Sequence, residues 1–198
     1  MTEKAARSED QLLAAWRAAA PGSKERGRLC LEMAARRSPT TVAPMAEYLA
    51  DPNDKDGVRA VVVLRHVGNA EAVTELKRSL ATAPPLVVAA AARSLAELGA
   101  RDAAPDLIAC LERRGDELGQ SRVSVIQALW RMPHVSPVPV LAKYLRSRGR
   151  LTRSGAARAL YKIDGPESLA ALQAAVDDQA WWMSRFSRKA LRLKKGRG

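Results

Sequence analysis

Few side chains in this sequence have the types and spacing that catalysis requires. The two histidines are His66 and His134, and neither precedes the glutamate that a repeated His-Glu metal site needs. The two cysteines, Cys30 and Cys110, form no Cys-x-x-Cys motif, so we expect reduced structural thiols. No Gly-Lys-Ser/Thr sequence is present to bind a phosphate, and nothing marks a nucleophile. We therefore expect no metal, no cofactor and no enzymatic activity.

Basic side chains are the stronger candidates for function, and they gather toward the C-terminal end. The chain of 198 residues carries a net charge of +12, and residues 149–198 hold 11 basic and 4 acidic side chains. A one-ended positive field of this kind favours an acidic partner. Within this region Arg185, Arg188, Arg192 and Lys195 are spaced 3, 4 and 3 residues apart, which places them on one helix face, with Lys189 in the same segment.

A repeat of 31 residues predicts the elements that position these side chains. One column of apolar residues recurs at steps of 31, 31, 34, 31 and 31 residues: Met33, Leu64, Leu95, Leu129, Leu160 and Leu191. A second column repeats the same steps: Leu49, Leu80, Leu111, Leu145 and Val176. A fixed period of this size indicates helix pairs that bury their apolar faces on neighbouring pairs. The longer step places three extra residues near 113–120, where we expect a surface loop.

The repeat predicts an all-α fold, an α-solenoid of about six antiparallel helix pairs. We expect one domain over residues 1–194, with an N-terminal cap at about 8–37 and a basic C-terminal cap helix at about 182–194. Residues 195–198 are expected to form a flexible basic tail. No apolar run is long enough to span a membrane, and no signal peptide begins the chain, so we expect a cytoplasmic monomer.

The repeat resembles a known family. Residues 153–163, Arg-Ser-Gly-Ala-Ala-Arg-Ala-Leu-Tyr-Lys-Ile, are similar to the Val-Arg-x-x-Ala-Ala-x-Ala-Leu-Gly-x-Leu-Gly signature of short bacterial HEAT-like repeats of the phycobilisome-lyase type. Residues 87–99 and 58–68 match it in part. The resemblance covers about residues 22–193 and implies a curved HEAT-like superhelix whose Val-Arg-x-x-Ala-Ala helices line the concave side. Members of this family include adaptors, bilin lyases and a metal hydroxylase, so the resemblance does not select a function.

The concave face would carry the candidate binding residues. Counted from the anchor leucines, the residues two before, one after and two after would lie on this face. These rows bring together Arg93, Arg158, Lys189, Trp130, Tyr161, Arg131 and Lys162. Arginine and large aromatic residues are enriched in the energetic centres of binding surfaces. The alternative is that the aromatic side chains fill space between helices and the charges are only solvated.

Three functions follow from these observations. The first is a non-enzymatic scaffold or adaptor that binds an acidic protein or peptide through the concave face and the basic C-terminal end. The alternative is binding of a DNA or RNA backbone by the same cations. A third is a DNA glycosylase, because a related HEAT-like fold serves such enzymes; it would use Trp130, Tyr161, Trp181 and Trp182 with Asp164 or Asp177.

Overall fold

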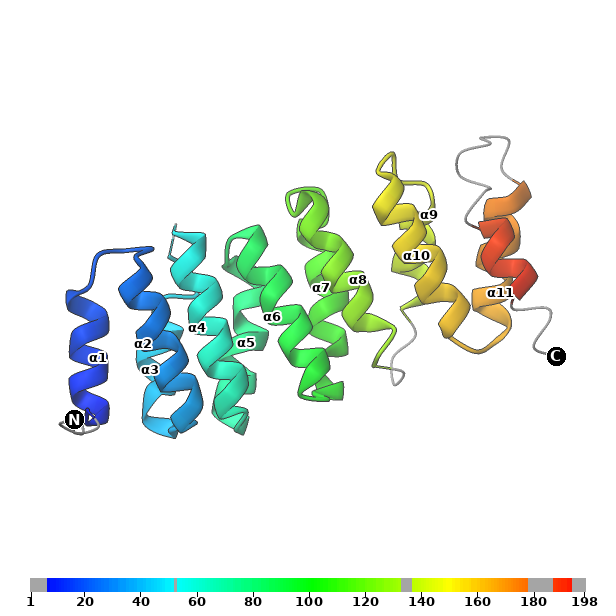
Figure 1. Ribbon diagram of the computed structural model, residues 1–198. Coiled ribbons are helices and arrows are strands. Elements are labelled where there is room, and N and C mark those ends of the chain that lie inside the picture. Colours follow the sequence, from blue (N-terminus) through cyan, green and yellow to red (C-terminus); the bar gives the residue numbers. More distant parts are fainter. Residues whose placement is uncertain (1–6, 52, 133–136, 178–186, 194–198) are drawn as a thin grey trace. The chain divides into compact units, whose positions relative to one another are not determined.

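The computed structural model describes residues 7–51, 53–132, 137–177 and 187–193, and every regular element in these ranges is helical. The chain forms two compact units, Met1–Leu98 and Gly99–Gly198. The first contains α1 (Glu9–Ala18), α2 (Lys24–Arg36), η1 (Pro39–Thr41), α3 (Val42–Ala46), α4 (Asp54–Val67), α5 (Ala70–Thr82) and α6 (Pro85–Glu97) (Figure 1). The second contains η2 (Arg101–Ala103), α7 (Ala104–Arg114), η3 (Gly119–Ser121), α8 (Arg122–Leu129), α9 (Val138–Leu145), α10 (Arg150–Lys162), α11 (Pro166–Asp177) and a helical segment at 187–193. The prediction of an all-α chain is confirmed.

Local sequence signals explain where several of the helices begin or end. Ser8 caps α1 by a reciprocal pair of hydrogen bonds, because its hydroxyl accepts from the Gln11 amide and the Gln11 side chain accepts from the Ser8 amide. Asn69 caps α5 in the same sense, with its side-chain oxygen accepting from the Ala72 amide. Gly68 ends α4 in the left-handed conformation with φ of 64°. These local signals set the start of α1, the start of α5 and the end of α4.

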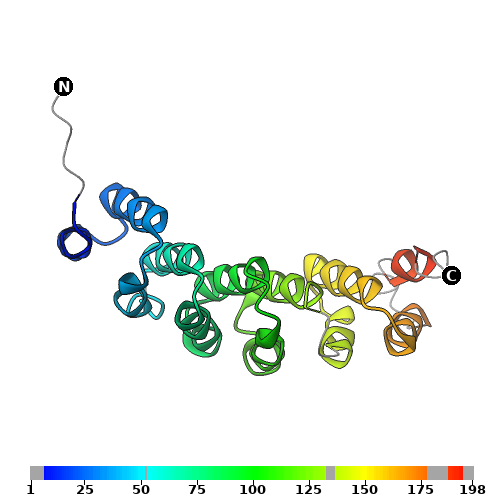
Figure 2. The same ribbon diagram turned by 90° about the horizontal axis from the view of Figure 1, so that it is seen from below.

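The first unit has two layers of helices. Helices α2, α4 and α6 pack in a row, with α4 in the middle (Figure 2). Helix α3 packs on α4, and α5 packs on both α4 and α6, so the second helices of the repeats form the other layer.

The second unit repeats this layering. Helix α10 packs against α8 on one side and against α9 behind it, α7 packs on α8, and α11 packs on α9 and α10. The row formed by α8 and α10 leaves one face of each helix uncovered by the other layer. This face carries the candidate site.

The repeated leucine columns form the core of both units. The anchor residues Met33, Leu64, Leu95, Leu129, Leu160 and Leu191 are all buried, as are Leu49, Leu80, Leu111 and Leu145 of the second column. Val176, the last member, is only partly buried. Burying a leucine-sized side chain stabilises a fold by about 1.5–3 kcal/mol, so the period of the sequence is also the period of the stabilising contacts.

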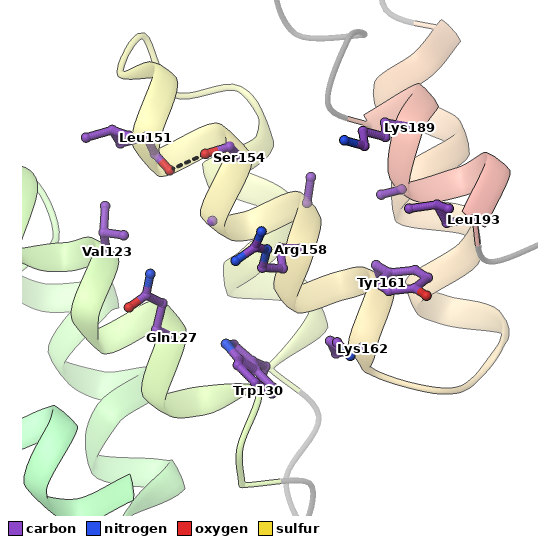
Figure 3. A pocket seen from close by; sticks show the side chains of 13 residues that line it. Val123, Gln127, Trp130, Leu151, Ser154, Arg158, Tyr161, Lys162, Lys189 and Leu193 are labelled. Carbon is purple, nitrogen blue, oxygen red and sulfur yellow. Dashed lines mark hydrogen bonds between the residues drawn. The ribbon is translucent and has the colours of Figure 1, made fainter. Parts of the chain in front are cut away.

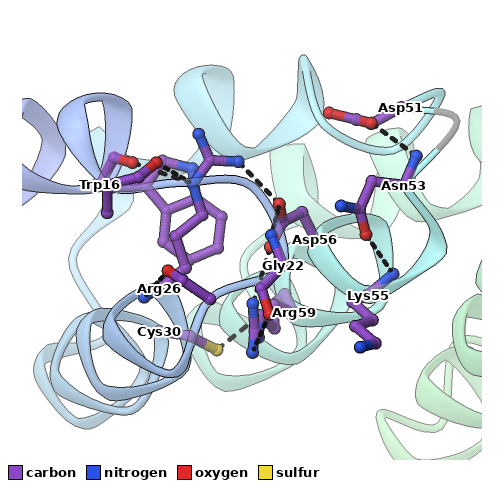
Figure 4. Close-up of polar contacts among 11 residues, drawn as sticks. Trp16, Gly22, Arg26, Cys30, Asp51, Asn53, Lys55, Asp56 and Arg59 are labelled. Atoms are coloured by element: carbon purple, nitrogen blue, oxygen red, sulfur yellow. Dashed lines mark hydrogen bonds and ion pairs between the residues drawn. The ribbon is translucent and has the colours of Figure 1, made fainter.

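A buried carboxylate connects α1, α2 and α4 in the first unit (Figure 4). Asp56 of α4 has 0% exposed surface and accepts hydrogen bonds from the Gly22 amide at 2.8 Å, Arg26 Nη1 at 2.7 Å and Arg59 Nη1 at 2.8 Å. Burial alone raises the pKa of Asp56, but these three donors outweigh that effect and hold the pKa below its usual value. The charge is therefore retained inside the unit.

Arg26 links this carboxylate to the N-terminal helix. Its Nε donates to the carbonyl oxygens of Trp16 at 3.1 Å and Ala19 at 3.0 Å, which satisfies the C-terminal end of α1. Its guanidinium also lies 5.3 Å from the ring centroid of Trp16 and 5.4 Å from that of Tyr48. One side chain thus fastens the first helix to the rest of the unit.

Candidate binding groove

An open groove of about 740 Å³ lies on the uncovered face of the second unit. Residues of α8, α10 and the 187–193 segment form it, and we call it the α8–α10 groove (Figure 3). It is lined by Val123, Gln127, Trp130, Leu151, Ser154, Gly155, Ala157, Arg158, Tyr161, Lys162, Lys189, Ala190 and Leu193. No carboxylate belongs to this lining.

The helical spacing of α10 explains why these side chains face the groove together. Leu151, Ser154, Arg158 and Tyr161 follow one another at steps of 3, 4 and 3 residues, so they form a single stripe. The opposite stripe of α10 is buried in the unit: Ala156, Ala159 and Leu160. Because one face of α10 is buried in the unit, the side chains of its other face are exposed in the groove beside α8.

Part of the groove wall is apolar and exposed. Leu151 keeps 54% of its surface exposed and Leu193 keeps 49%, although both are large aliphatic side chains. Trp130, at the C-terminal end of α8, and Tyr161 of α10 also line the groove, and both are partly buried. The indole Nε1 of Trp130 is covered, and within the described ranges it has no hydrogen-bond acceptor. An apolar patch bordered by polar groups is typical of a protein-binding surface.

The groove is also positively charged. Arg158, Lys162 and Lys189 line it, and within the part of the chain that the structure describes none of them lies within 4.0 Å of a carboxylate oxygen. Figure 3 shows Arg158 reaching from α10 toward Gln127 and Trp130 of α8. Lys162 Nζ lies 5.7 Å from the ring centroid of Tyr161, so cation and ring share this side of the groove.

Several cations of the first unit are paired with carboxylates. Arg65 of α4 pairs with Glu97 of α6, and Arg36 of α2 pairs with Glu32 at 3.1 Å. Part of the positive charge of the first unit is therefore neutralised by ion pairs, whereas the groove cations have no carboxylate beside them in the lining.

The structure brings together some of the residues predicted from the sequence. Trp130, Arg158, Tyr161, Lys162 and Lys189 all line the groove.

The other predicted residues within the described ranges lie outside the groove. Arg131 is exposed with its guanidinium 5.4 Å from the Trp130 ring centroid, Arg93 donates to the Ala89 carbonyl in the first unit, and Arg188 and Arg192 are exposed outside the groove lining. Arg185, Lys195 and the predicted tail 195–198 lie outside the described residues, as does the first part of the predicted cap helix.

Several groove residues were not predicted from the sequence. Val123 and Ser154 each lie six residues before an anchor leucine, and Leu151 lies nine before Leu160. The rows used for prediction began two residues before the anchor, so they excluded the earlier turns of the same helix face. The signal was present in the period, and extending the rows by one and two turns would have found these positions.

The other candidate groups lie apart from the groove. Burial raises the pKa of the free thiols Cys30 and Cys110 to about 11, which keeps both protonated and unreactive. His66 Nδ1 lies 2.8 Å from the Val62 carbonyl oxygen of its own helix. Asp164, the carboxylate considered for a glycosylase, is exposed after α10 and does not line the groove. Within the described ranges, no three metal-ligating side chains gather at one place.

None of the helices that the structure describes has the length and hydropathy needed to cross a membrane. His134, Trp181 and Trp182 lie outside the described residues, and Asp177 is the last residue of α11.

The layered helix pairs and their leucine period define an α-solenoid, a class of repeat protein in which each unit packs on its neighbours. The family model for HEAT repeats matches residues 42–123 and 114–192. The chain belongs to the HEAT-repeat family, which confirms the predicted family and the solenoid.

Solved structures share this fold at low sequence identity. The complex of CpcE and CpcF of phycocyanin lyase from Nostoc sp. PCC7120 is similar with a TM-score of 0.61 and 21% identity, over 96% of this chain and 77% of that one. An engineered protein matches with a TM-score of 0.53 and 17% identity, over 96% of this chain and 97% of its own. A designed armadillo repeat protein matches with a TM-score of 0.50 and 14% identity, over 93% and 99%. No curated protein sequence matches the chain significantly.

Proposed function

We propose that this protein is a non-enzymatic, cytoplasmic HEAT-repeat scaffold, monomeric by itself, that binds a segment of another protein in the α8–α10 groove. The segment combines acidic side chains with large apolar ones. The carboxylates would pair with Arg158, Lys162 and Lys189, and the apolar side chains would cover Leu151 and Leu193. The observation that carries the proposal is this combination of exposed leucines and cations without carboxylates in one groove.

The combination favours a protein over other partners. Interface centres are built from aromatic, arginine and aliphatic anchors, and charges around them select partners and speed association. Trp130 and Tyr161 provide rigid aromatic surface that loses little conformational entropy on binding. The structure from Nostoc sp. PCC7120 is itself a complex of two proteins, so a stack of this fold can bind another protein. At 21% identity the likeness carries over the fold and no particular partner.

Selection from random displayed peptides tests the proposal, and it does not require an identified partner. We expect peptides enriched on the full chain to contain Asp or Glu beside Leu, Phe or Trp. Arg158→Glu/Lys162→Glu is expected to weaken such a peptide at least about 10-fold at ~150 mM salt, because each carboxylate would then face a like charge. Trp130→Ala is expected to weaken it by a similar factor through loss of an aromatic anchor. Isothermal titration calorimetry measures both.

The matched control is Lys24→Glu/Arg113→Glu, which changes the net charge equally at exposed positions outside the groove lining. We expect it to change the affinity by less than about 3-fold, because screened charges outside the interface contribute little. Equal weakening by both double variants would contradict the proposal, since binding would then follow net charge alone. Full affinity in the groove variant would also contradict it.

A further inference from the structure

A second hollow in the second unit has a different chemistry. It has a volume of about 490 Å³ and lies between the 116–122 turns and the turn that joins α9 to α10. It shares no lining residue with the α8–α10 groove. Four cations line it, Arg122, Lys143, Arg146 and Arg148. None of them was among the binding residues predicted from the sequence.

One residue of the lining carries a carboxylate. Asp116 is the carboxylate in the lining; one of its oxygens is 3.5 Å from Arg122 Nη1, and its side chain is 97% exposed. Lys143 and Arg148 are exposed, and neither has a carboxylate within 4.0 Å in the described ranges. Arg122 is held in place by the Gly119 carbonyl, 2.6 Å from its Nε. The hollow therefore combines one fixed cation with two exposed ones, Lys143 and Arg148, that can extend toward an anion.

A buried guanidinium beneath the α9–α10 turn adds to this field. Arg153 is only 7% exposed, and its Nη1 donates to the carbonyl oxygens of Ser147 at 2.8 Å and Arg148 at 2.6 Å. Within the part of the chain that the structure describes, it has no carboxylate partner, and its Nε has no hydrogen-bond acceptor. Buried charges are normally paired. The positive charge of Arg153 thus remains uncompensated below the surface of the hollow.

The start of α10 adds backbone donors at the same place. Gly149 precedes the helix and offers no side-chain cap. The first amide groups of α10 are therefore not satisfied by a cap, and the N-terminal end of a helix favours negative charge. This feature supplements the cations and is not needed to form the hollow.

We propose that this hollow binds the phosphate backbone of a nucleic acid. Phosphate contacts in such complexes come from Arg and Lys, from hydroxyl and amide side chains, and from backbone amides at helix starts. The lining supplies these groups, because Gln120, Ser147, Thr152 and two glycines lie beside the cations. It includes no alanine, valine, leucine, isoleucine, methionine or proline. A protein interface would need apolar anchors, which the α8–α10 groove has and this hollow lacks.

The same lining predicts that binding does not depend on base sequence. Its aromatic residue, Tyr144, is buried and donates its hydroxyl to the Leu111 carbonyl at 2.8 Å, so its ring is not a stacking platform for bases. Recognition would rest on phosphates alone, and affinity would fall steeply with salt.

The test uses the full chain and a fluorescent DNA duplex of about 24 base pairs, followed by anisotropy across a salt series. We expect Lys143→Glu/Arg148→Glu to weaken binding at least about 10-fold and to lower the salt slope by about 2, since two phosphate contacts are lost. Both side chains are exposed, so circular dichroism should show an unchanged fold. Lys24→Glu/Arg113→Glu, also at exposed positions, is the control with the same change of charge and should weaken binding by less than about 3-fold.

Each other outcome overturns the proposal. Unchanged duplex binding in the hollow variant, or equal loss in the control, would show that the hollow is not the nucleic-acid site. Tight binding of tripolyphosphate that the hollow variant abolishes, without duplex binding, would indicate a small phosphate ligand instead. Loss of the selected acidic peptide in the hollow variant, with no duplex binding, would assign the hollow to the protein interface.

Discussion

At the scale of single residues, Asp56 is the clearest case of a charge that the fold keeps buried. Three donors from separate places in the first unit satisfy it, and two of them are guanidinium groups. Removing one partner of such a cluster leaves the others buried without compensation, which destabilises more than the pair itself stabilises. The cluster fixes α1 and α2 on α4.

We predict that Asp56→Asn lowers the free energy of unfolding by about 3 kcal/mol at neutral pH. Because the folded-state pKa of Asp56 is depressed, its contribution is fully present above the unfolded pKa of about 3.9. It is lost as the pH falls through the lower folded value. The difference between wild type and variant should therefore shrink between about pH 5 and pH 2, as measured by urea unfolding.

Glu47→Gln, an exposed carboxylate of the same unit, is the control, and it should change stability by less than about 0.5 kcal/mol. A difference between wild type and Asp56→Asn that stays constant down to pH 2 would contradict the assignment of a depressed pKa.

The sequence predicted five of the thirteen groove residues because a residue's distance from its anchor leucine sets its helix face. Trp130, Arg158, Tyr161, Lys162 and Lys189 follow from that rule. The rule cannot say which cations are neutralised, because Glu97 and Arg65 pair across neighbouring helices and are 32 residues apart in the chain. The same rule also selected Arg93, which lies in α6 of the first unit and does not line the groove.

At the scale of elements, the 34-residue step between Leu95 and Leu129 is absorbed between α7 and α8. The sequence predicted a surface loop here, and the structure shows turns followed by η3. The segment is not entirely on the surface, because Gly115 and Leu118 are buried. It packs back onto the unit and supplies Asp116, Gly119 and Gln120 to the second hollow.

Gly115 fills a position where no side chain fits. A Cβ at this residue would overlap the Tyr144 hydroxyl oxygen and the Leu111 carbonyl oxygen, the two atoms that form a hydrogen bond of 2.8 Å. We predict that Gly115→Ala lowers the free energy of unfolding by about 2–3 kcal/mol, measured by urea denaturation. Adding Tyr144→Phe should make the double variant less unstable than the sum of the single changes, because it removes one of the overlapping atoms.

Gly155→Ala provides the comparison. A Cβ on this residue of α10 would lie 3.7 Å from Val123 and 3.8 Å from Ile126 of α8, which is ordinary van der Waals contact. We expect it to raise stability by about 0.5–1 kcal/mol, because alanine favours a helix over glycine. Destabilisation by Gly155→Ala equal to that of Gly115→Ala would contradict the steric account.

Most of the fold could be predicted from the sequence because the packing of a solenoid is local, and the three-residue insertion is tolerated for the same reason. In a solenoid each helix packs on its neighbours in the chain, so a local period predicts tertiary burial. The cluster of Gly22, Arg26 and Asp56 lay beyond prediction, since ion pairing inside a unit depends on the approach of helices and leaves no periodic signal.

At the scale of the whole molecule, the second unit carries most of the excess positive charge and presents it on two surfaces. The α8–α10 groove joins cations to leucine and aromatic side chains, which suits a protein segment. The hollow beside the α9–α10 turn joins cations to hydroxyl and amide donors, which suits phosphates. Both surfaces are positive, so charge alone does not select between a protein and a nucleic acid. The selection comes from the neighbouring side chains, which are apolar and aromatic in the groove and polar in the hollow.

Photo-crosslinking locates the bound segment and tests the groove most directly. A peptide selected on the full chain would carry a photoreactive phenylalanine analogue at its central apolar position, and tandem mass spectrometry would identify the joined residues. We expect crosslinks at groove residues, among them Trp130, Leu151, Tyr161 and Leu193, and their loss in Arg158→Glu/Lys162→Glu. Crosslinks concentrated in Met1–Leu98, or unchanged in that variant, would contradict it.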